Sequence, residues 1–218
     1  GNKERFVYFG TPCRKAIDAY MVERKKVVLT DNRALFGSRN GNRISVTAVH
    51  RLVEKGKVRH LGGSNYDTWR FAEANAVAKT PYTVMQQWFT YLQARGDKAP
   101  QYIFNEYADR ERLRYLEAKN IPMVAYSCLA KGGYENAARL PAELVAGERL
   151  AVLQTMAKEK GVSASALAVA WMVNLHRCPG FPRIIPLFGS SCVEHFVSNL
   201  RGAELTLTVE DLQQLNNA

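Results

Sequence analysis

The 218-residue sequence has few side chains that bind metal ions or form disulfide bridges: four cysteines and four histidines. The cysteines lie too far apart to form a C-x-x-C metal pair or a dense disulfide framework, which indicates reduced thiols in a cytoplasmic protein. The histidines are equally scattered, and no H-x-x-x-H pair occurs among them. We therefore expect no metal site.

Long apolar runs and a secretory leader are also lacking. No stretch approaches the roughly 18 consecutive apolar residues of a membrane-spanning helix, so we expect no membrane partner. The first 15 residues carry five charged side chains, which argues against a secretory signal peptide. No G-x-G-x-x-G sequence follows the first strand pattern, and this argues against a Rossmann-type dinucleotide-binding fold.

Basic residues, by contrast, are in excess and unevenly placed. Residues 1–60 hold 14 Lys and Arg against 5 Asp and Glu, a net charge of +9, whereas the whole chain carries +10. Such asymmetry fits either a nucleic-acid-binding arm or a solvated surface with a few phosphate-binding groups. The basic residues are interleaved with apolar ones and match no recognised nucleic-acid motif, which favours the second interpretation and no nucleic-acid partner.

Helix and strand patterns alternate from about residue 46 onwards. This alternation implies βαβ units with a parallel sheet, in a barrel or a doubly wound arrangement. The chain is shorter than the roughly 250 residues of a complete (β/α)₈ barrel. The predicted helices are 46–56, 67–80, 107–119, 147–160, 163–176, 192–201 and 208–216. The predicted strands are 82–89 and 121–129, and the segments 57–65 and 182–191 are each predicted to be a strand that runs into a loop.

Residues at helix ends support these boundaries. Gly56 is a suitable residue just past a helix end, and Gly161 separates two helices. Asp67 and Ser163 are suitable N-caps. Before residue 46 the patterns are weaker: 5–10 and 25–31 resemble strands, and 35–43 resembles a loop.

Five motifs occur in residues 52–216: LVEKGKVRHLGGSNYDTWRFAEA (52–74), VMQQWFTYL (84–92), VAYSCLAKGGY (124–134), SASALAVAWMV (163–173) and IIPLFGSSCVEHFVSNL (184–200). Together they resemble the aldo-keto reductase family, in its order and at its spacing. The resemblance implies an α/β fold, a TIM-type (β/α) barrel that is incomplete, with about five to six β/α units and the first units missing. Residues 46–218 would form this barrel portion, and residues 1–45 a basic N-terminal segment with degenerate strands.

The resemblance also implies an NADP(H) site. Ser64 and Asn65 match the turn that binds the nicotinamide carboxamide, and Gln86 matches a strand residue that serves the same group. A carboxamide has one acceptor and two donors, and these residues supply partners of both kinds. Tyr126 matches the aromatic residue that stacks on the nicotinamide ring and so fixes which face offers the hydride.

Other residues match the rest of the dinucleotide site. Each also has an ordinary alternative role, since a serine pair before a helix is usually a cap. Ser198 stands where the family usually has Glu, and His195 where it often has Arg or Gln. By resemblance, Ser127 and Leu129 cradle the pyrophosphate, Ser190, Ser191 and His195 lie near the adenosine ribose and its 2′-phosphate, and Asn199 contacts the adenine.

The family's Asp-Tyr-Lys-His catalytic tetrad has no match. Its tyrosine protonates the carbonyl oxygen, and a phenol with a pKa near 10 needs tuning by its neighbours to do so at neutral pH. No D-T-A-x-x-Y-G stretch is present. Thr11 falls where the family has Lys, and Leu29 or Thr30 falls where it has His, so the catalytic residues stay unknown.

Three functions are therefore open. The first is NADPH-dependent reduction of an aldehyde or ketone to an alcohol, with a small-molecule carbonyl substrate and an acid from elsewhere; Tyr8 and Tyr20 are the candidates within the chain. The second is a catalytically inactive NADP(H)-binding pseudoenzyme or truncation product. The third is a basic nucleic-acid-binding module. An incomplete barrel also leaves an open sheet edge, which suggests a homodimer through that edge.

Overall fold

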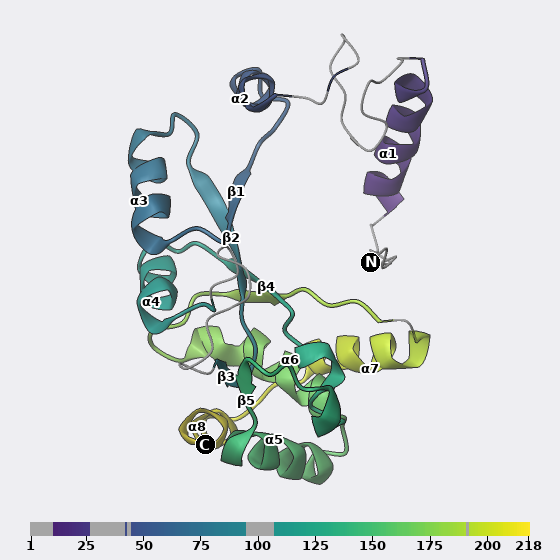
Figure 1. Ribbon diagram of the computed structural model, residues 1–218, viewed down its shortest axis with the longest axis vertical. Coiled ribbons are helices and arrows are strands. Elements are labelled where there is room, and N and C mark those ends of the chain that lie inside the picture. Colours follow the sequence, from purple (N-terminus) through teal and green to yellow (C-terminus); the bar gives the residue numbers. More distant parts are fainter. Residues whose placement is uncertain (1–10, 27–41, 43–44, 95–106, 191) are drawn as a thin grey trace. The chain divides into compact units, whose positions relative to one another are not determined.

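The computed structural model describes residues 11–26, 42, 45–94, 107–190 and 192–218 (Figure 1). The chain divides into two compact units, Gly1–His60 and Leu61–Ala218. The predicted strand at 5–10 lies outside the described residues, as do most of the predicted strand at 25–31 and of the loop at 35–43.

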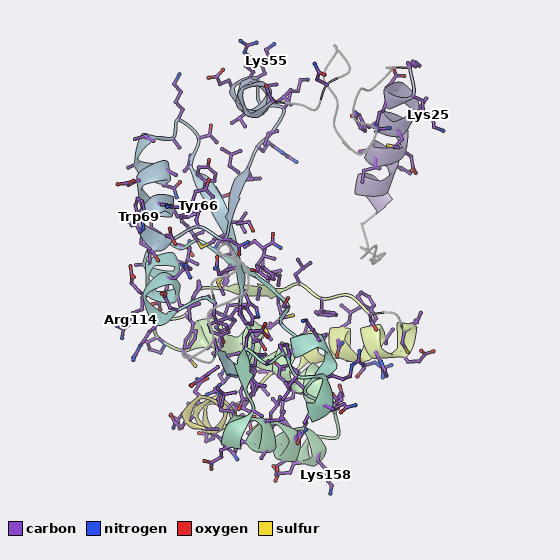
Figure 2. All side chains as sticks on the ribbon, in the orientation of Figure 1. Lys25, Lys55, Tyr66, Trp69, Arg114 and Lys158 are labelled. Carbon is purple, nitrogen blue, oxygen red and sulfur yellow. The ribbon has the colours of Figure 1, made fainter. Side chains whose placement is uncertain are left out.

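The first unit contains helices α1 (Thr11–Arg24) and α2 (Val46–Glu54). α2 begins as predicted: its N-cap Ser45 accepts a hydrogen bond from the Ala48 backbone N–H. Gly56 follows its end with φ +65°, a conformation that glycine adopts without strain. Exposed basic side chains of this unit include Lys25 and Lys55 (Figure 2).

Helix α1 is absent from the elements predicted from the sequence. It lies between the two predicted strands of the N-terminal segment. Its half-buried residues Ile17, Tyr20 and Met21 have the i, i+3, i+4 spacing of one helix face. That spacing extends over a single turn, and so short an apolar pattern does not by itself distinguish a helix from a strand.

The second unit is built on a four-stranded parallel sheet in the order β1-β2-β4-β6. The parallel βαβ arrangement predicted from the alternating patterns is confirmed. Two strands lie within the segments predicted as a strand and loop, 57–65 and 182–191, and the other two are shorter than the predicted 82–89 and 121–129. A two-stranded antiparallel pair, which the sequence did not indicate, joins β3 (Gln93–Ala94) and β5 (Leu144–Val145). The four parallel strands are β1 (Leu61–Ser64), β2 (Tyr82–Trp88), β4 (Met123–Tyr126) and β6 (Ile184–Pro186).

The helices of this unit match their predicted positions to within a few residues. α3 and α4 lie beside each other along one side of the sheet (Figure 1). Met85 and Met123 of adjacent strands are fully buried, together with Phe71 of α3 and Leu116 of α4. The helices are α3 (Thr68–Val77), α4 (Arg110–Ala118), α5 (Gly147–Glu159), α6 (Ala164–Asn174), α7 (Val193–Glu204) and α8 (Val209–Asn217), with short 3₁₀ helices η1 (Ala130–Gly132), η2 (Ala137–Arg139) and η3 (Leu175–Arg177).

The two predicted N-caps of this unit differ in chemistry. Ser163 accepts a hydrogen bond from the Ala166 backbone N–H at 3.1 Å and so caps α6 in the ordinary way. Asp67 occupies the N-cap position of α3, but its carboxylate makes an ion pair with Arg70 at 3.1 Å and caps no backbone N–H. Within the described part of the chain, no helix has the length and apolar character needed to cross a membrane.

Helices α6 and α7 approach each other closely at Gly202. A Cβ atom at this position would lie 2.2 Å from the carbonyl oxygen of Ala166. We expect Gly202→Ala to lower the free energy of unfolding by about 1–3 kcal/mol, since a methyl group would force two packed backbones apart. Urea unfolding followed by circular dichroism measures this change. Ala203→Ser, at the exposed neighbouring position, is the control, and equal stability of the two variants would contradict the close packing.

Candidate functional site

The carboxyl ends of three strands bring together residues that the sequence predicted to act together. Ser64 is paired in register with Gln86, and Trp88 is paired with Tyr126. Paired residues of parallel strands project to the same face, and alternate residues of one strand share a face. Ser64, Gln86 and Tyr126 therefore lie on one face of the sheet, opposite the face that buries Met85 and its neighbours.

Asn65 connects the three strands through hydrogen bonds. Its backbone N–H donates to the carbonyl oxygen of Gln86 at 3.0 Å. Its side-chain Oδ1 accepts a hydrogen bond from the hydroxyl of Tyr126 at 2.8 Å. Asn65 has φ +57°, a left-handed conformation that asparagine tolerates better than most residues. This turn therefore fixes both the asparagine amide and the tyrosine ring.

The phenol of Tyr126 is held in its neutral form. Burial raises its pKa above the usual value, and the hydrogen bond to Asn65 lowers it in part. Because the hydroxyl hydrogen is directed to Asn65, the phenol is a poor proton donor toward a substrate. The arrangement suits a ring that packs against a flat ligand better than it suits an acid catalyst.

The turn after β4 has an unusual backbone. Ser127, Ala130 and Lys131 all have positive φ, at 53°, 48° and 55°. Within the turn, the backbone N–H groups of Ala130 and Gly132 donate to the carbonyl oxygens of Ser127 and Leu129 at 3.1 and 2.9 Å, which holds this backbone in place. Ser127 is exposed and Leu129 is half-buried, so the turn that the sequence assigned to the pyrophosphate is accessible.

The residues assigned to the adenosine end lie at α7. Ser190 is engaged locally: its hydroxyl accepts from the Cys192 N–H at 3.1 Å and donates to the Cys192 carbonyl oxygen at 2.8 Å. His195 is exposed in the first turn of the helix, whereas Asn199 is buried, with 5% of its surface exposed. Ser191 lies outside the described residues.

The residues that align with members of the catalytic tetrad, and the two tyrosines that are candidate acids, belong to the first unit. Thr11 is the first residue of α1, and Tyr20 is half-buried on the same helix. Tyr8, Leu29 and Thr30 lie outside the described residues. Among the residues that the structure describes, no group of three or more His, Cys, Asp or Glu side chains could hold a metal ion.

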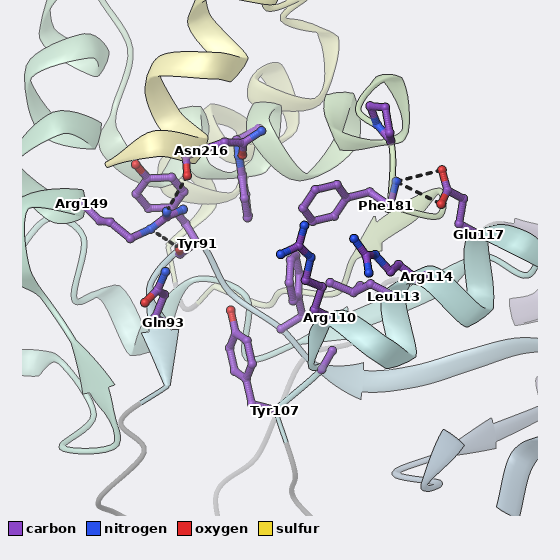
Figure 3. Close-up of a pocket in the computed structure, with 15 residues that line it drawn as sticks. Tyr91, Gln93, Tyr107, Arg110, Leu113, Arg114, Glu117, Arg149, Phe181 and Asn216 are labelled. Carbon is purple, nitrogen blue, oxygen red and sulfur yellow. Dashed lines mark hydrogen bonds between the residues drawn. The ribbon is translucent and has the colours of Figure 1, made fainter. Parts of the chain in front are cut away.

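A second feature, absent from the sequence predictions, is a cavity of about 740 Å³ between α4, α6 and α8 (Figure 3). Its aromatic residues pack against one another: Phe89 and Trp171 stack with ring centroids 5.6 Å apart, and Phe89 and Tyr107 lie 5.7 Å apart. The lining residues are Phe89, Tyr91, Gln93, Tyr107, Ala108, Arg110, Leu113, Arg114, Glu117, Arg149, Trp171, Pro179, Gly180, Phe181 and Asn216.

Two comparisons with known proteins agree on one family. The family model described as "Aldo/keto reductase family" matches residues 17–218. Norsolorinic acid reductase A of Aspergillus parasiticus is 24% identical over 186 residues, which cover 78% of this chain and 43% of that protein. The chain thus spans less than half the length of this relative.

Solved structures share the same architecture. An aldo-keto reductase from Klebsiella pneumoniae, solved in complex with NADPH, is 25% identical with a TM-score of 0.57, covering 79% of this chain and 52% of that one. An incomplete α/β barrel, as the sequence predicted, is thereby confirmed.

A different protein matches a shorter part. Tyrosine recombinase XerC of Caldanaerobacter subterraneus subsp. tengcongensis is 36% identical over 88 residues, which cover 40% of this chain and 24% of that protein.

Proposed function

The chain belongs to the aldo/keto reductase family, and from this premise we propose that its second unit binds NADP(H) at the carboxyl ends of β1, β2 and β4. The observation that carries the proposal is the cluster of Ser64, Asn65, Gln86 and Tyr126. Their positions follow from strand register and from two hydrogen bonds, so they are arranged before any ligand arrives. The Klebsiella pneumoniae structure in complex with NADPH supports the choice of cofactor.

The polar groups of the cluster fit a nicotinamide carboxamide. Asn65 uses Oδ1 to accept from Tyr126, so its Nδ2 group remains available to donate to a carbonyl oxygen. The Gln86 side chain and the Ser64 hydroxyl can accept from an amide nitrogen. The bound cofactor would supply a hydride. The protein would hold the nicotinamide ring against Tyr126 and keep water from one of its faces.

The other site residues are proposed to hold the remainder of the cofactor. The turn with Ser127 and Leu129 would receive the pyrophosphate. Near the start of α7, Ser190, Ser191 and His195 would lie beside the ribose and its 2′-phosphate, where a helix N-terminus favours an anion. Asn199 could contact the adenine only through its small exposed surface.

We propose further that carbonyl reduction by this chain is slow or absent. The reaction of the family is reduction of an aldehyde or ketone to an alcohol. This reaction needs a hydride for the carbonyl carbon and a proton donor for the carbonyl oxygen. The only tyrosine in the described cluster directs its hydroxyl to Asn65. Loss of a general acid typically costs a factor of about 10²–10⁴ in rate.

Oxidation of NADPH followed at 340 nm, with 4-nitrobenzaldehyde as the carbonyl substrate, tests this second proposal. Typical enzymes turn over at about 1–10³ s⁻¹, so we expect no more than about 0.1 s⁻¹ here, with cofactor binding retained. A turnover above about 1 s⁻¹ would show that the chain contains a working acid and would identify it as an ordinary reductase.

We also propose that a second copy of the chain covers an open edge of the sheet. Within the described part of the second unit, β1 pairs only with β2, and β6 only with β4. Exposed edges of parallel sheets are rare in stable proteins. Size-exclusion chromatography with light scattering should give about twice the chain mass of 24.5 kDa, and a clean 24.5 kDa species would contradict the dimer.

A second candidate function concerns the first unit, for which we propose nucleic-acid binding. The proposal takes up the alternative that the sequence leaves open for the net charge of +9 of this unit. Lys25, Lys55 and Lys57 are among its exposed basic residues. The electrostatic part of such binding weakens steeply as salt rises.

Fluorescence anisotropy with a labelled random-sequence DNA duplex tests this candidate. We expect binding at 50 mM salt that weakens by about tenfold or more at 200 mM. Lys25→Gln/Lys55→Gln/Lys57→Gln should weaken binding, while Lys119→Gln/Lys158→Gln, two exposed positions in the second unit, should leave it unchanged. Binding that ignores salt or responds equally to both variants would rule out the first unit as the site.

A further inference from the structure

The cavity between α4, α6 and α8 shares no lining residue with those proposed to hold NADP(H). We propose that it binds an aromatic carboxylate, independently of the cofactor. Its volume of about 740 Å³ falls within the range of small-molecule sites in proteins, about 300–1,000 Å³. The chemistry of its lining has two parts, an aromatic wall and a pair of uncommitted cations.

The aromatic wall is rigid. Phe89 and Trp171 stack nearly parallel, with an angle of 12° between their rings, and are each 3% exposed. Tyr91 packs edge-on against Trp171 at 5.0 Å. Phe181 contributes a further ring on the other side of the cavity (Figure 3). Such walls favour a flat apolar ligand, which loses little conformational freedom when it binds.

The polar groups of the wall already have partners. The Tyr107 hydroxyl donates to the carbonyl oxygens of Thr90 at 2.6 Å and Leu92 at 3.1 Å. The indole N–H of Trp171 donates to Asn216 Oδ1 at 2.8 Å. None of these hydrogens is available to a ligand.

Two charged groups of the lining are likewise committed. Arg149 donates to the carbonyl oxygens of Tyr91 at 3.1 Å and Ala218 at 3.0 Å, and its guanidinium lies 4.4 Å from the Tyr91 ring centre. Both carboxylate oxygens of Glu117 accept from the Gly180 N–H at 3.0 Å. The one negative charge of the lining therefore faces the backbone of the loop before β6.

Arg110 and Arg114 differ from these groups. They lie one helical turn apart on α4, and their guanidinium groups point into the cavity toward Phe181 (Figure 3). Within the described residues, neither guanidinium makes a hydrogen bond or an ion pair that would satisfy it. Both side chains are exposed and stay charged.

The side chains of the lining that can still hydrogen-bond to a ligand are thus the guanidinium groups of Arg110 and Arg114 and the Gln93 amide. Guanidinium groups offer donors in a planar fork that matches a carboxylate. A carboxylate on an aromatic ring would place its charge at Arg110 and Arg114 and its ring against the wall. Inorganic phosphate has no apolar part and would contact only the two arginines. Contact of the ligand's aromatic ring with the wall would therefore make the cavity prefer an aromatic carboxylate to phosphate.

Calorimetric titration of the full chain with 2-naphthoate tests the proposal. We expect saturable binding, and binding of the neutral isostere 2-naphthamide at least about fivefold weaker, because the charged contacts are solvent-exposed and contribute modestly. Arg110→Gln/Arg114→Gln should weaken 2-naphthoate to the level of the amide. Arg201→Gln, an exposed arginine on α7, is the matched control and should change nothing.

Three outcomes would overturn the proposal. They are equal affinity for the acid and the amide, no response to Arg110→Gln/Arg114→Gln in a protein with an unchanged circular dichroism spectrum, and displacement of 2-naphthoate by equimolar inorganic phosphate. Saturating NADPH should leave the affinity for 2-naphthoate unchanged, and competition between them would place the acid at the strand ends instead. Failure of NADPH to bind would not affect the result, so the two proposals fail separately.

Discussion

Tyr126→Ala should weaken NADPH binding by roughly tenfold or more. Stacking of a flat ring on an aromatic side chain contributes about 1–3 kcal/mol by alanine substitution. The substitution also removes the hydrogen bond that holds the Asn65 amide, so the carboxamide loses an oriented partner as well. The measurement is a titration of NADPH fluorescence with the wild-type chain and the variant at the same ionic strength.

Tyr126→Phe is the matched control for this prediction. It keeps the ring and removes only the hydroxyl that donates to Asn65. We expect a loss of about threefold, which corresponds to a single neutral hydrogen bond on the protein side. If Tyr126→Ala binds NADPH as tightly as the wild type, the ring does not contact the cofactor, and the strand-end site is wrong.

Tyr134→Phe is expected to give the largest loss of stability. The Tyr134 hydroxyl is fully buried and lies within hydrogen-bond distance of the Thr90 hydroxyl. It also accepts from the Tyr91 N–H at 2.9 Å and donates to the Cys128 carbonyl oxygen at 3.0 Å. Burial raises the pKa of this phenol above its usual value, which favours the protonated form that donates to Cys128.

Removing that hydroxyl leaves several buried polar groups without their partner. Each unsatisfied group costs about 1–3 kcal/mol, so the free energy of unfolding should fall by about 2–5 kcal/mol. Urea unfolding measures the change. Tyr66→Phe, at a half-buried tyrosine with no described hydroxyl contact, should cost less than about 1 kcal/mol. Equal losses for the two variants would mean that the Tyr134 contacts contribute nothing to stability.

Most of the second unit could be predicted from local sequence signals. An amphipathic pattern indicated the helix at 107–119, and Gly161 and Ser163 marked the boundary between α5 and α6. These signals can be read from the sequence because the residues that form the apolar face of a helix and cap its ends lie close together in the chain. The strands predicted at 82–89 and 121–129 are longer than β2 and β4, since an apolar run continues beyond the residues that pair.

Other features depend on contacts between distant residues. The β3–β5 pair joins two-residue strands about fifty residues apart in the chain, and so short a strand has no pattern of its own. The cavity combines residues from Phe89 to Asn216, and only the i, i+4 pair Arg110 and Arg114 gave any local sign of it. An arginine pair on a helix usually belongs to a solvated face, so the pair by itself does not indicate a cavity.

The candidate site was predicted in part. The motifs gave the identities of Ser64, Asn65, Gln86 and Tyr126, and the structure gives their shared face. The sequence could not indicate that the Tyr126 hydroxyl donates to Asn65, because side-chain direction depends on strand register. The depth at which Asn199 is buried was also not predictable, since it follows from the close approach of α7 to α6.

The central claim is that the strand ends hold the nicotinamide end of NADP(H). Saturation-transfer NMR of NADP⁺ with the full chain reports which cofactor protons touch the protein. We expect strong transfer to the nicotinamide ring protons in the wild type and its loss in Tyr126→Ala. Transfer confined to the adenine protons, or none at millimolar cofactor, would contradict the claim.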